Sequence, residues 1–141
     1  MMVFAYPVVL TKESDGYTAV MPDVHAAHTE GDTRAEALAR AADALETALS
    51  FYIDKNEDLP APSPVRGRPV VVPSAGGALK LHIYQAMRDQ KVSKAELARR
   101  MKVRPYQIQR LLDLCHNSTT DQLEAALKAL GVRVKITAEA A

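Results

Sequence analysis

The chain has 141 residues and a formal net charge of +1. This length fits one ordinary domain or two small ones, and its 48% hydrophobic and 25% charged residues exclude a wholly disordered chain. No stretch approaches the roughly 20 apolar residues that span a bilayer, and residues 1–6 lack the basic start and apolar run of a secretory signal. Because Cys115 is the single cysteine, an internal disulfide and a cysteine-based zinc site are also excluded. We therefore expect a cytoplasmic protein.

The near-zero total charge is the sum of two oppositely charged halves. Residues 1–64 hold four basic and eleven acidic residues, a net charge of −7, whereas residues 65–141 hold fourteen basic and six acidic residues, a net charge of +8. A basic half favours a polyanion as its partner, and an acidic half favours a basic protein. Chance clustering of surface charges is the alternative explanation. The asymmetry predicts that the two halves have different partners.

The first part of the chain has the pattern of three strands. Residues 3–11 are rich in β-branched and aromatic side chains, which predicts a strand. Within it, Pro7 indicates an edge or a bulge because proline lacks a backbone donor. Residues 16–21 predict a second strand that forms a hairpin with the first, and residues 27–30 predict a third short extended segment.

A helix and a fourth strand complete this part. Thr33 and Glu36 have the spacing of a capping box, so the helix is predicted to start there and to end near residue 55. Residues 68–72 predict a strand that returns to the sheet across the proline-rich residues 59–64. The expected N-terminal domain therefore has the order β-β-β-α-β. One face of its helix carries an apolar stripe at helical spacing, made of Leu38, Ala41, Ala42, Leu45, Leu49 and Ile53.

A linker at residues 74–78 is expected to separate two domains, residues 1–73 and residues 79–141, in a fold of the α+β class. The second domain is expected to be all-helical, with Gly131 as a left-handed helix stop. Residues 132–136 alternate apolar and basic side chains, which predicts a short terminal strand. Its helices are predicted at residues 79–90, 93–101, 105–113 and 119–130.

The segment from Lys94 to Leu111 has the spacing of two short helices that cross at a tight turn. Such a crossing needs a small residue at the closest approach, here Ala98, and apolar residues in the shared core, here Val103 and Ile108. Basic residues between them provide phosphate affinity. The segment resembles the helix-turn-helix of phage-repressor-like transcription regulators, except that Lys102 stands where those motifs usually have glycine. A left-handed Lys102 costs about 1 kcal/mol relative to glycine.

This resemblance implies that the helix starting at Pro105 is a recognition helix. An arginine side chain can bind guanine, and a glutamine side chain can bind adenine, through two hydrogen bonds each. Helix N-termini can bind phosphate through their backbone N–H groups. A helical protein-binding domain with a solvated basic face is the alternative. The expected DNA-binding residues are Ser93, Lys94, Arg104, Tyr106, Gln107, Gln109, Arg110, Asn117, Ser118 and Thr119.

Short phrases along nearly the whole chain resemble the helix-turn-helix branch of the HicB antitoxin family. The family's usual Pro-Gly and apolar residue are replaced here by His25, Ala26 and His28. The N-terminal phrases are Tyr6-Pro-Val-Val-Leu10, Gly16-Tyr17, Pro22-Asp23, and Glu30-Gly-Asp-Thr33 followed by a Glu-Ala-Leu helix. The C-terminal phrases are Lys94-Ala-Glu-Leu-Ala-Arg-Arg, Arg110-Leu-Leu-Asp and His116-Asn-Ser-Thr.

The resemblance implies a protein partner and a DNA partner. HicB proteins neutralise HicA, a small basic toxin that cleaves mRNA with a histidine, and their N-terminal domain covers the toxin. Their C-terminal domain binds operator DNA of the same operon. The resemblance also implies a partial ribonuclease-H-like fold for the N-terminal domain. Ribonuclease-H chemistry needs clustered carboxylates around two metal ions, but no strand carboxylate is available to join Glu36 and Glu46. We therefore expect a binding protein without enzymatic activity and without a cofactor.

Histidines and the cysteine offer few further candidates for chemistry. His25 and His28 could join Asp23 or Asp32 around a metal ion, but two histidines without a clear third ligand are a weak signal, so no metal site is expected. Cys115 follows an apolar run and is expected to be a small buried residue. The residues expected to contact the toxin are Asp23, His25, Glu30 and Asp32.

The expected terminal strand, residues 132–136, suggests how the protein assembles. A lone strand has unpaired edges, so two of them can pair across a two-fold axis and form a homodimer or part of a higher homo-oligomer. Dimers matter because symmetric repressors bind two half-sites on DNA. The alternative function is a one-component regulator with a ligand-sensing N-terminal domain. That function needs an apolar pocket, for which four strands and one helix leave little room.

Overall fold

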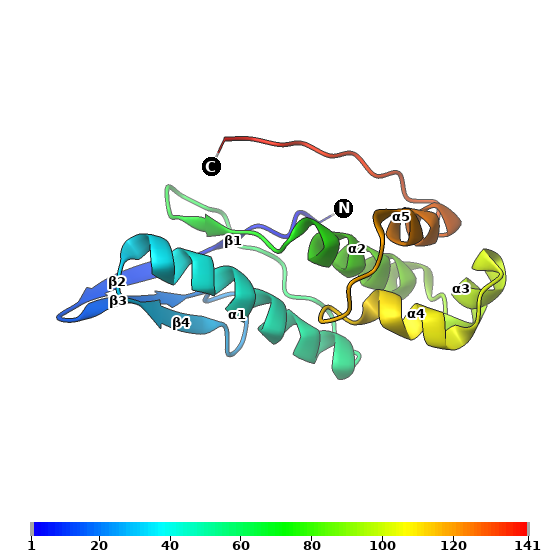
Figure 1. The fold of residues 1–141 in the computed structure, drawn as a ribbon, viewed down its shortest axis with the longest axis horizontal. Coiled ribbons are helices and arrows are strands. Elements are labelled where there is room, and N and C mark those ends of the chain that lie inside the picture. Colours follow the sequence, from blue (N-terminus) through cyan, green and yellow to red (C-terminus); the bar gives the residue numbers. More distant parts are fainter. Residues whose placement is uncertain (1, 141) are drawn as a thin grey trace. The chain divides into compact units, whose positions relative to one another are not determined.

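The computed structural model describes residues 2–140, and their contacts divide the chain into two units. Unit 1 ends at Ala78 and unit 2 begins at Leu79. The described strands belong to unit 1, and the fold is α+β, as the sequence predicts (Figure 1). Within residues 2–140, no helix is long and apolar enough to cross a membrane.

The first predicted strand is divided in two at Val8. Its two pieces, β1 (Tyr6–Pro7) and β2 (Val9–Glu13), pair with different neighbours. β1 lies antiparallel to β5 (Val70–Val71) in a two-stranded sheet of its own, so the fourth strand returns to the first predicted strand but does not join the three-stranded sheet. The Val8 N–H continues this pairing by donating to the carbonyl oxygen of Pro69 at 2.8 Å. Pro7 has no N–H to donate, and just after it, at Val9, the chain changes its partner strand from β5 to β3.

The hairpin and the third strand form an antiparallel sheet in the order β2-β3-β4. β3 spans Gly16–Val20 and β4 spans His28–Gly31, close to the predicted ranges. Since side chains alternate along a strand, the register gives this sheet one face turned toward the helix and one exposed face. We call the exposed one the open sheet face. It consists of Val9 and Thr11 on β2, Thr18 and Val20 on β3, and His28 and Glu30 on β4.

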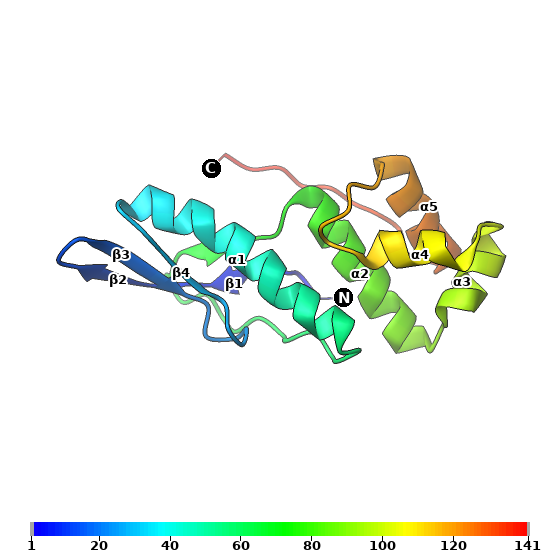
Figure 2. The same cartoon turned by 60° about the horizontal axis from the view of Figure 1, so that its bottom comes forward.

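Helix α1 (Arg34–Asp54) covers the other face of this sheet (Figures 1 and 2). Thr33 caps it by accepting the Glu36 N–H at 3.1 Å, as the capping spacing predicts. A side chain on Gly31 would place its Cβ 2.5 Å from the Ala37 backbone nitrogen, so only glycine permits this close approach of strand and helix. The buried helix residues are Ala37, Ala41, Leu45, Ala48 and Leu49.

The proline-rich segment is an internal loop of unit 1. The Tyr6 hydroxyl donates to the carbonyl oxygen of Pro60 at 2.7 Å. Asp23 accepts the Ser63 N–H at 2.8 Å and also the Ser63 hydroxyl. Burial, with the nearby Asp23 carboxylate, raises the pKa of Tyr6 well above its usual value, so the hydroxyl remains a hydrogen-bond donor. These contacts hold the loop against the strands.

Four helices build the remaining part, of which the first begins earlier than the sequence predicts. Ser74 accepts the Gly77 N–H through its hydroxyl at 3.1 Å and the Ala78 N–H through its carbonyl at 2.8 Å. This cap starts the helix inside the predicted linker, which is helical from Ala75 onward. The helices are α2 (Ala75–Gln90), α3 (Lys94–Met101), α4 (Pro105–Leu112) and α5 (Thr120–Ala129). The largest fully buried side chains of unit 2 are Leu81, Ile83, Leu97, Ile108, Leu123 and Leu127.

The predicted terminal strand is absent from the described residues. Gly131 has a φ of +73°, the left-handed stop that the sequence predicts. Residues 132–136 then follow without strand pairing. A strand is defined by hydrogen bonds to a neighbouring strand, and the part of unit 2 that the structure describes offers no such neighbour. Ile136 is consequently 78% exposed.

Candidate functional site

The centre of unit 2 is the crossing of α3 and α4. Ala98 is 2% exposed and lies beside the turn, where its carbonyl oxygen accepts the Val103 N–H at 3.0 Å. Leu97 and Ile108 are fully buried beneath this turn. Lys102 occupies the turn with φ 58° and ψ 41°, which is the left-handed conformation. The small, apolar and turn positions therefore lie where the spacing of the sequence places them.

Four of the expected DNA-binding residues lie on α4, where Tyr106, Gln109 and Arg110 are exposed and Gln107 is half-buried. Tyr106 is 55% exposed, and the Arg110 guanidinium carbon lies 5.3 Å from the centre of its ring. This cation–π contact orients Arg110 without burying it. The Gln109 side-chain oxygen accepts a hydrogen bond from Lys94 on α3, and the Gln107 side-chain oxygen accepts the Arg104 N–H at 3.0 Å. Each of these four side chains therefore has a contact within unit 2.

Two of the expected DNA-binding residues, Ser93 and Thr119, are helix caps. Ser93 accepts the Glu96 N–H at 3.1 Å at the start of α3. Thr119 accepts the Gln122 N–H at 3.1 Å and donates its own N–H to the Gln122 side-chain oxygen at 2.9 Å. These caps leave the first N–H groups of two helices near the surface, where an anion can bind. Asn117, two residues before Thr119, is exposed.

Glu96 reduces the positive charge of α3. Its carboxylate accepts hydrogen bonds from Arg99, one of them at 2.9 Å, and from the Arg100 Nε at 3.4 Å. The hydrogen bond from Arg99 and the charge of both guanidinium groups lower the pKa of Glu96 to about 2. Arg99 and Arg100 are therefore paired within α3, whereas Lys102 and Arg104 in the turn are exposed.

Lys80 on α2 also contributes to this site, because it holds the loop after α4, and the sequence reasoning did not identify it. It is 3% exposed, and its ammonium nitrogen lies 2.7–3.0 Å from four oxygen atoms of residues 110–118. Burial lowers its pKa, while the nearby Asp113 carboxylate acts in the opposite direction. Its sequence signal is its position four residues before Tyr84 and seven before Met87, which places a lysine on the buried side of the helix.

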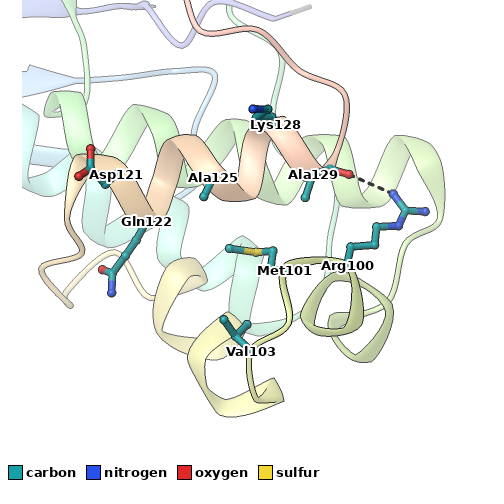
Figure 3. Close-up of a pocket in the computed structure, with 8 residues that line it drawn as sticks. All are labelled: Arg100, Met101, Val103, Asp121, Gln122, Ala125, Lys128 and Ala129. Atoms are coloured by element: carbon teal, nitrogen blue, oxygen red, sulfur yellow. Dashed lines mark hydrogen bonds between the residues drawn. The ribbon is translucent and has the colours of Figure 1, made fainter.

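An apolar groove lies between α5 and the end of α3 (Figure 3). Its volume is about 490 Å³. Met101 and Val103 face Ala125 across it, and Arg100 closes one end by donating to the Ala129 carbonyl oxygen at 3.3 Å. The other lining residues are Asp121, Gln122 and Lys128. The groove is open to solvent and presents an apolar floor with a charged rim.

The four expected toxin contacts divide into two pairs at opposite ends of β4. Asp23 is half-buried and bound to Ser63, while His25 is exposed and donates its backbone N–H to the Tyr52 hydroxyl at 3.1 Å. Glu30 and Asp32 lie at the other end, in a polar cleft beside the turn between β2 and β3. Glu13, Asp15 and Arg40 line the same cleft, so four carboxylates and one guanidinium group give it an acidic balance.

The helix carboxylates considered for metal-dependent chemistry have structural contacts. Glu36 forms an ion pair with Arg40 at 2.6 Å. Glu46 accepts the Ser74 N–H at 2.6 Å, near the start of α2. Across residues 2–140, no three His, Cys, Asp or Glu side chains gather in a group that could hold a metal ion.

The prediction that Cys115 is buried is wrong. The thiol is free and exposed. Its backbone N–H donates to the Asp113 side chain at 2.9 Å, and the neighbouring carbonyl groups of Asp113 and His116 turn inward to Lys80. Because the loop directs its backbone oxygens inward, the side chain between them points to solvent.

Taken together, these features define a two-unit protein with an acidic cleft beside the sheet of one unit and exposed cationic and amide side chains on a helix of the other. Comparison with known proteins identifies the family. Residues 5–80 match the model described as "HicB_like antitoxin of bacterial toxin-antitoxin system". The chain is 40% identical to Antitoxin HicB 2 of Photorhabdus laumondii over 94% of its own length and 95% of that protein. It is 37% identical to Antitoxin HicB of Escherichia coli K12 over 93% of its own length and 96% of that protein. The chain belongs to the HicB-like antitoxin family.

Proposed function

We propose that the two units have separate functions. Residues 1–73 bind and neutralise a HicA-type mRNA-cleaving toxin by covering its active site. Residues 79–141 form a helix-turn-helix domain that binds operator DNA and represses the protein's own operon. The family supports the antitoxin role, and the opposite charges of the two halves support the division between a basic protein and DNA. Both roles require binding rather than enzymatic chemistry.

The proposed DNA binding rests on the exposed side of α4. Arg110 and Gln109 are exposed on the helix that follows the turn. Ser93 and Thr119 cap α3 and α5, and the starts of these two helices face solvent. Guanidinium and amide groups bind base edges, while Lys94 and the helix starts bind phosphate. This division of labour requires α4 to lie in the major groove.

Two substitutions separate base contacts from phosphate contacts. We expect Arg110→Ala to lower the affinity for operator DNA by about 1–3 kcal/mol and to leave non-operator binding nearly unchanged. We expect Lys94→Ala to weaken binding to all sequences and to lower the salt slope by about one unit. Gel-shift titrations at several salt concentrations measure both effects. Unchanged operator binding by Arg110→Ala would reject the proposed orientation of α4.

A homodimer through unit 2 completes the DNA-binding proposal. The apolar groove around Met101 and Ala125, together with the exposed Ile136, provides apolar surface that a second copy can cover. Pairing of residues 132–136 from two copies would give each segment the strand neighbour it lacks. Truncation after Gly131 is therefore expected to yield a monomer by light scattering. A truncated protein that stays dimeric would refute the pairing of these segments.

We place the proposed toxin-binding surface on the open sheet face. Val9 and Val20 pair across β2 and β3 and are 40% and 42% exposed, respectively. Glu30 lies on the same face and borders the acidic cleft. An apolar centre with acidic groups at its edge is suited to a partner with a basic rim around an apolar contact.

A matched pair of variants tests this face. Val20→Arg places a positive charge at its centre, and Phe51→Arg places the same charge on a similarly exposed apolar position of α1, 49% against 42% for Val20. We expect Val20→Arg to weaken toxin binding by at least about tenfold, as for a central contact residue, and Phe51→Arg to have no effect. Binding is measured by titration of an inactive toxin. Equal affinities of the two variants would exclude the open sheet face as the toxin-binding surface.

A further inference from the structure

We propose that Lys80 is a positioning residue of the DNA-facing surface. Its buried ammonium group holds the end of α4 and the loop before α5 in one arrangement. This inference rests on the DNA binding proposed for unit 2. Lys80 lies near the start of α2 and is 3% exposed, and no other charged side chain of the described residues is buried to this degree.

The contacts of Lys80 reach across the whole loop. Its Nζ donates to the carbonyl oxygens of Arg110 at 2.8 Å, Asp113 at 2.8 Å and His116 at 2.7 Å. The Ser118 hydroxyl oxygen lies at 3.0 Å from the same nitrogen. An ammonium group has three N–H donors, so three carbonyl groups satisfy it and the hydroxyl shares one donor. The charged group is thereby compensated despite its burial.

The positive charge of Lys80 lies at the C-terminal end of α4, where it is electrostatically favourable. Arg110 is in the last turn of α4, whose carbonyl groups lack the usual helical partners and form the negative end of the helix dipole. Without the ammonium, three carbonyl oxygens would face one another with no donor between them. An apolar side chain of similar length would fill the space but remove one donor from each oxygen. The carbonyl oxygens of Arg110 and Asp113 would keep only the N–H groups of Asp113 at 3.2 Å and His116 at 3.1 Å. The loop would then open toward water to restore the lost hydrogen bonds.

The two ends of this loop carry residues of the proposed DNA surface. Arg110, whose backbone Lys80 holds, bears one of the proposed base-contacting side chains, and Ser118 immediately precedes the α5 cap Thr119. Lys80 thus fixes the end of α4 relative to the start of α5. Because Nζ is buried, it acts through the loop backbone and not by touching phosphate. Loss of Lys80 should therefore lower sequence preference without changing the salt dependence of binding.

The test compares Lys80→Met with Lys91→Gln in the full chain. The first variant removes the buried charge at similar side-chain length, and the second removes an exposed charge from the end of the same helix. Gel shifts use the DNA upstream of the protein's own gene and a scrambled fragment of equal length. For Lys80→Met we expect the affinity for upstream DNA to fall by at least about tenfold, with an unchanged salt slope and little change on scrambled DNA. Lys91→Gln should leave the ratio of the two affinities unchanged.

Amide hydrogen exchange provides a readout that does not depend on DNA. The amides of residues 113–118 should exchange faster in Lys80→Met, while amides in the middle of α5 keep their protection. Ser118→Ala, which removes only the shared acceptor, should give a smaller change in the same direction, and it serves as the second variant if Lys80→Met does not fold.

If the wild-type chain shows no preference for upstream DNA, the proposed DNA binding fails, and exchange alone decides the role of Lys80. Unchanged exchange in a folded variant would overturn the inference, and so would an equal loss of affinity on both DNA fragments with a reduced salt slope.

Discussion

Replacing Lys102 by glycine should stabilise unit 2. Lys102 ends α3 with φ 58° and ψ 41°, and its side chain is exposed. A side chain in this left-handed conformation costs roughly 1–2 kcal/mol, whereas glycine adds about 0.5–1 kcal/mol of unfolded-state entropy. The difference predicts a net gain of about 0.5–1 kcal/mol, or a rise of about 4 °C in the unfolding midpoint of a domain of this size.

Thermal unfolding followed by circular dichroism measures this gain, with Lys102→Ala as the control. Alanine removes the same charge as glycine but keeps the Cβ atom, so the strain of the turn remains. Lys91 ends α2 with φ 56°, and Lys91→Gly should therefore be stabilising for the same reason. If Lys102→Gly is no more stable than Lys102→Ala, the strain at this turn is not the dominant effect and the reasoning fails.

Three further changes test the packing and electrostatics of the two units. Leu45→Ala should cost unit 1 about 2–5 kcal/mol in urea unfolding, because Leu45 is 0% exposed where α1 packs on the sheet; a loss below 1 kcal/mol would place it outside the core. Ala26→Gly should stabilise unit 1 by up to about 1 kcal/mol, since Ala26 has a φ of +64°, and a destabilised variant would contradict that backbone assignment. The folded-state pKa of Glu96, about 2, lies below its ordinary value of 4.5, so its contribution to stability is present above pH 4.5 and is lost as the pH falls toward 2. Glu96→Gln should weaken this acid dependence of the midpoint, and an identical pH profile would show that the ion pairs contribute nothing.

Helix positions could be predicted because their signals are local. Thr33, Ser93 and Thr119 each accept an N–H three residues ahead, and each is followed at that distance by Glu or Gln, the residues of a capping box. Only Thr119 has the complete reciprocal box, with Gln122. Glu36 and Glu96 instead bind arginine side chains on the following helical turn. A capping residue binds the start of its own helix, so the nearby sequence is enough to predict its contact. A long acidic side chain can bind any partner within its range, so its contact depends on all the neighbouring side chains.

The contacts of the candidate site were less predictable because they join distant residues. The pattern correctly places Tyr106, Gln107 and Arg110 on the exposed side of α4 or at its edge. It does not predict that Lys94 holds Gln109 or that Lys80 holds the loop after α4, since these pairs are 15 and 30 or more residues apart. Side-chain spacing defines faces of one helix, but the crossing of helices decides which faces meet.

The exposure of Cys115 gives a direct chemical test of this loop. With one cysteine in the chain, a thiol reagent such as Ellman's reagent reports on a single site. Because the thiol is free and exposed, we expect one equivalent to react without denaturant, at a rate within about tenfold of that of an unhindered thiol. Cys115→Ser is the control and should not react. A thiol that reacts only after unfolding would mean that Cys115 is buried, as its apolar neighbours in the sequence suggest, and that the backbone of the loop does not turn inward to Lys80.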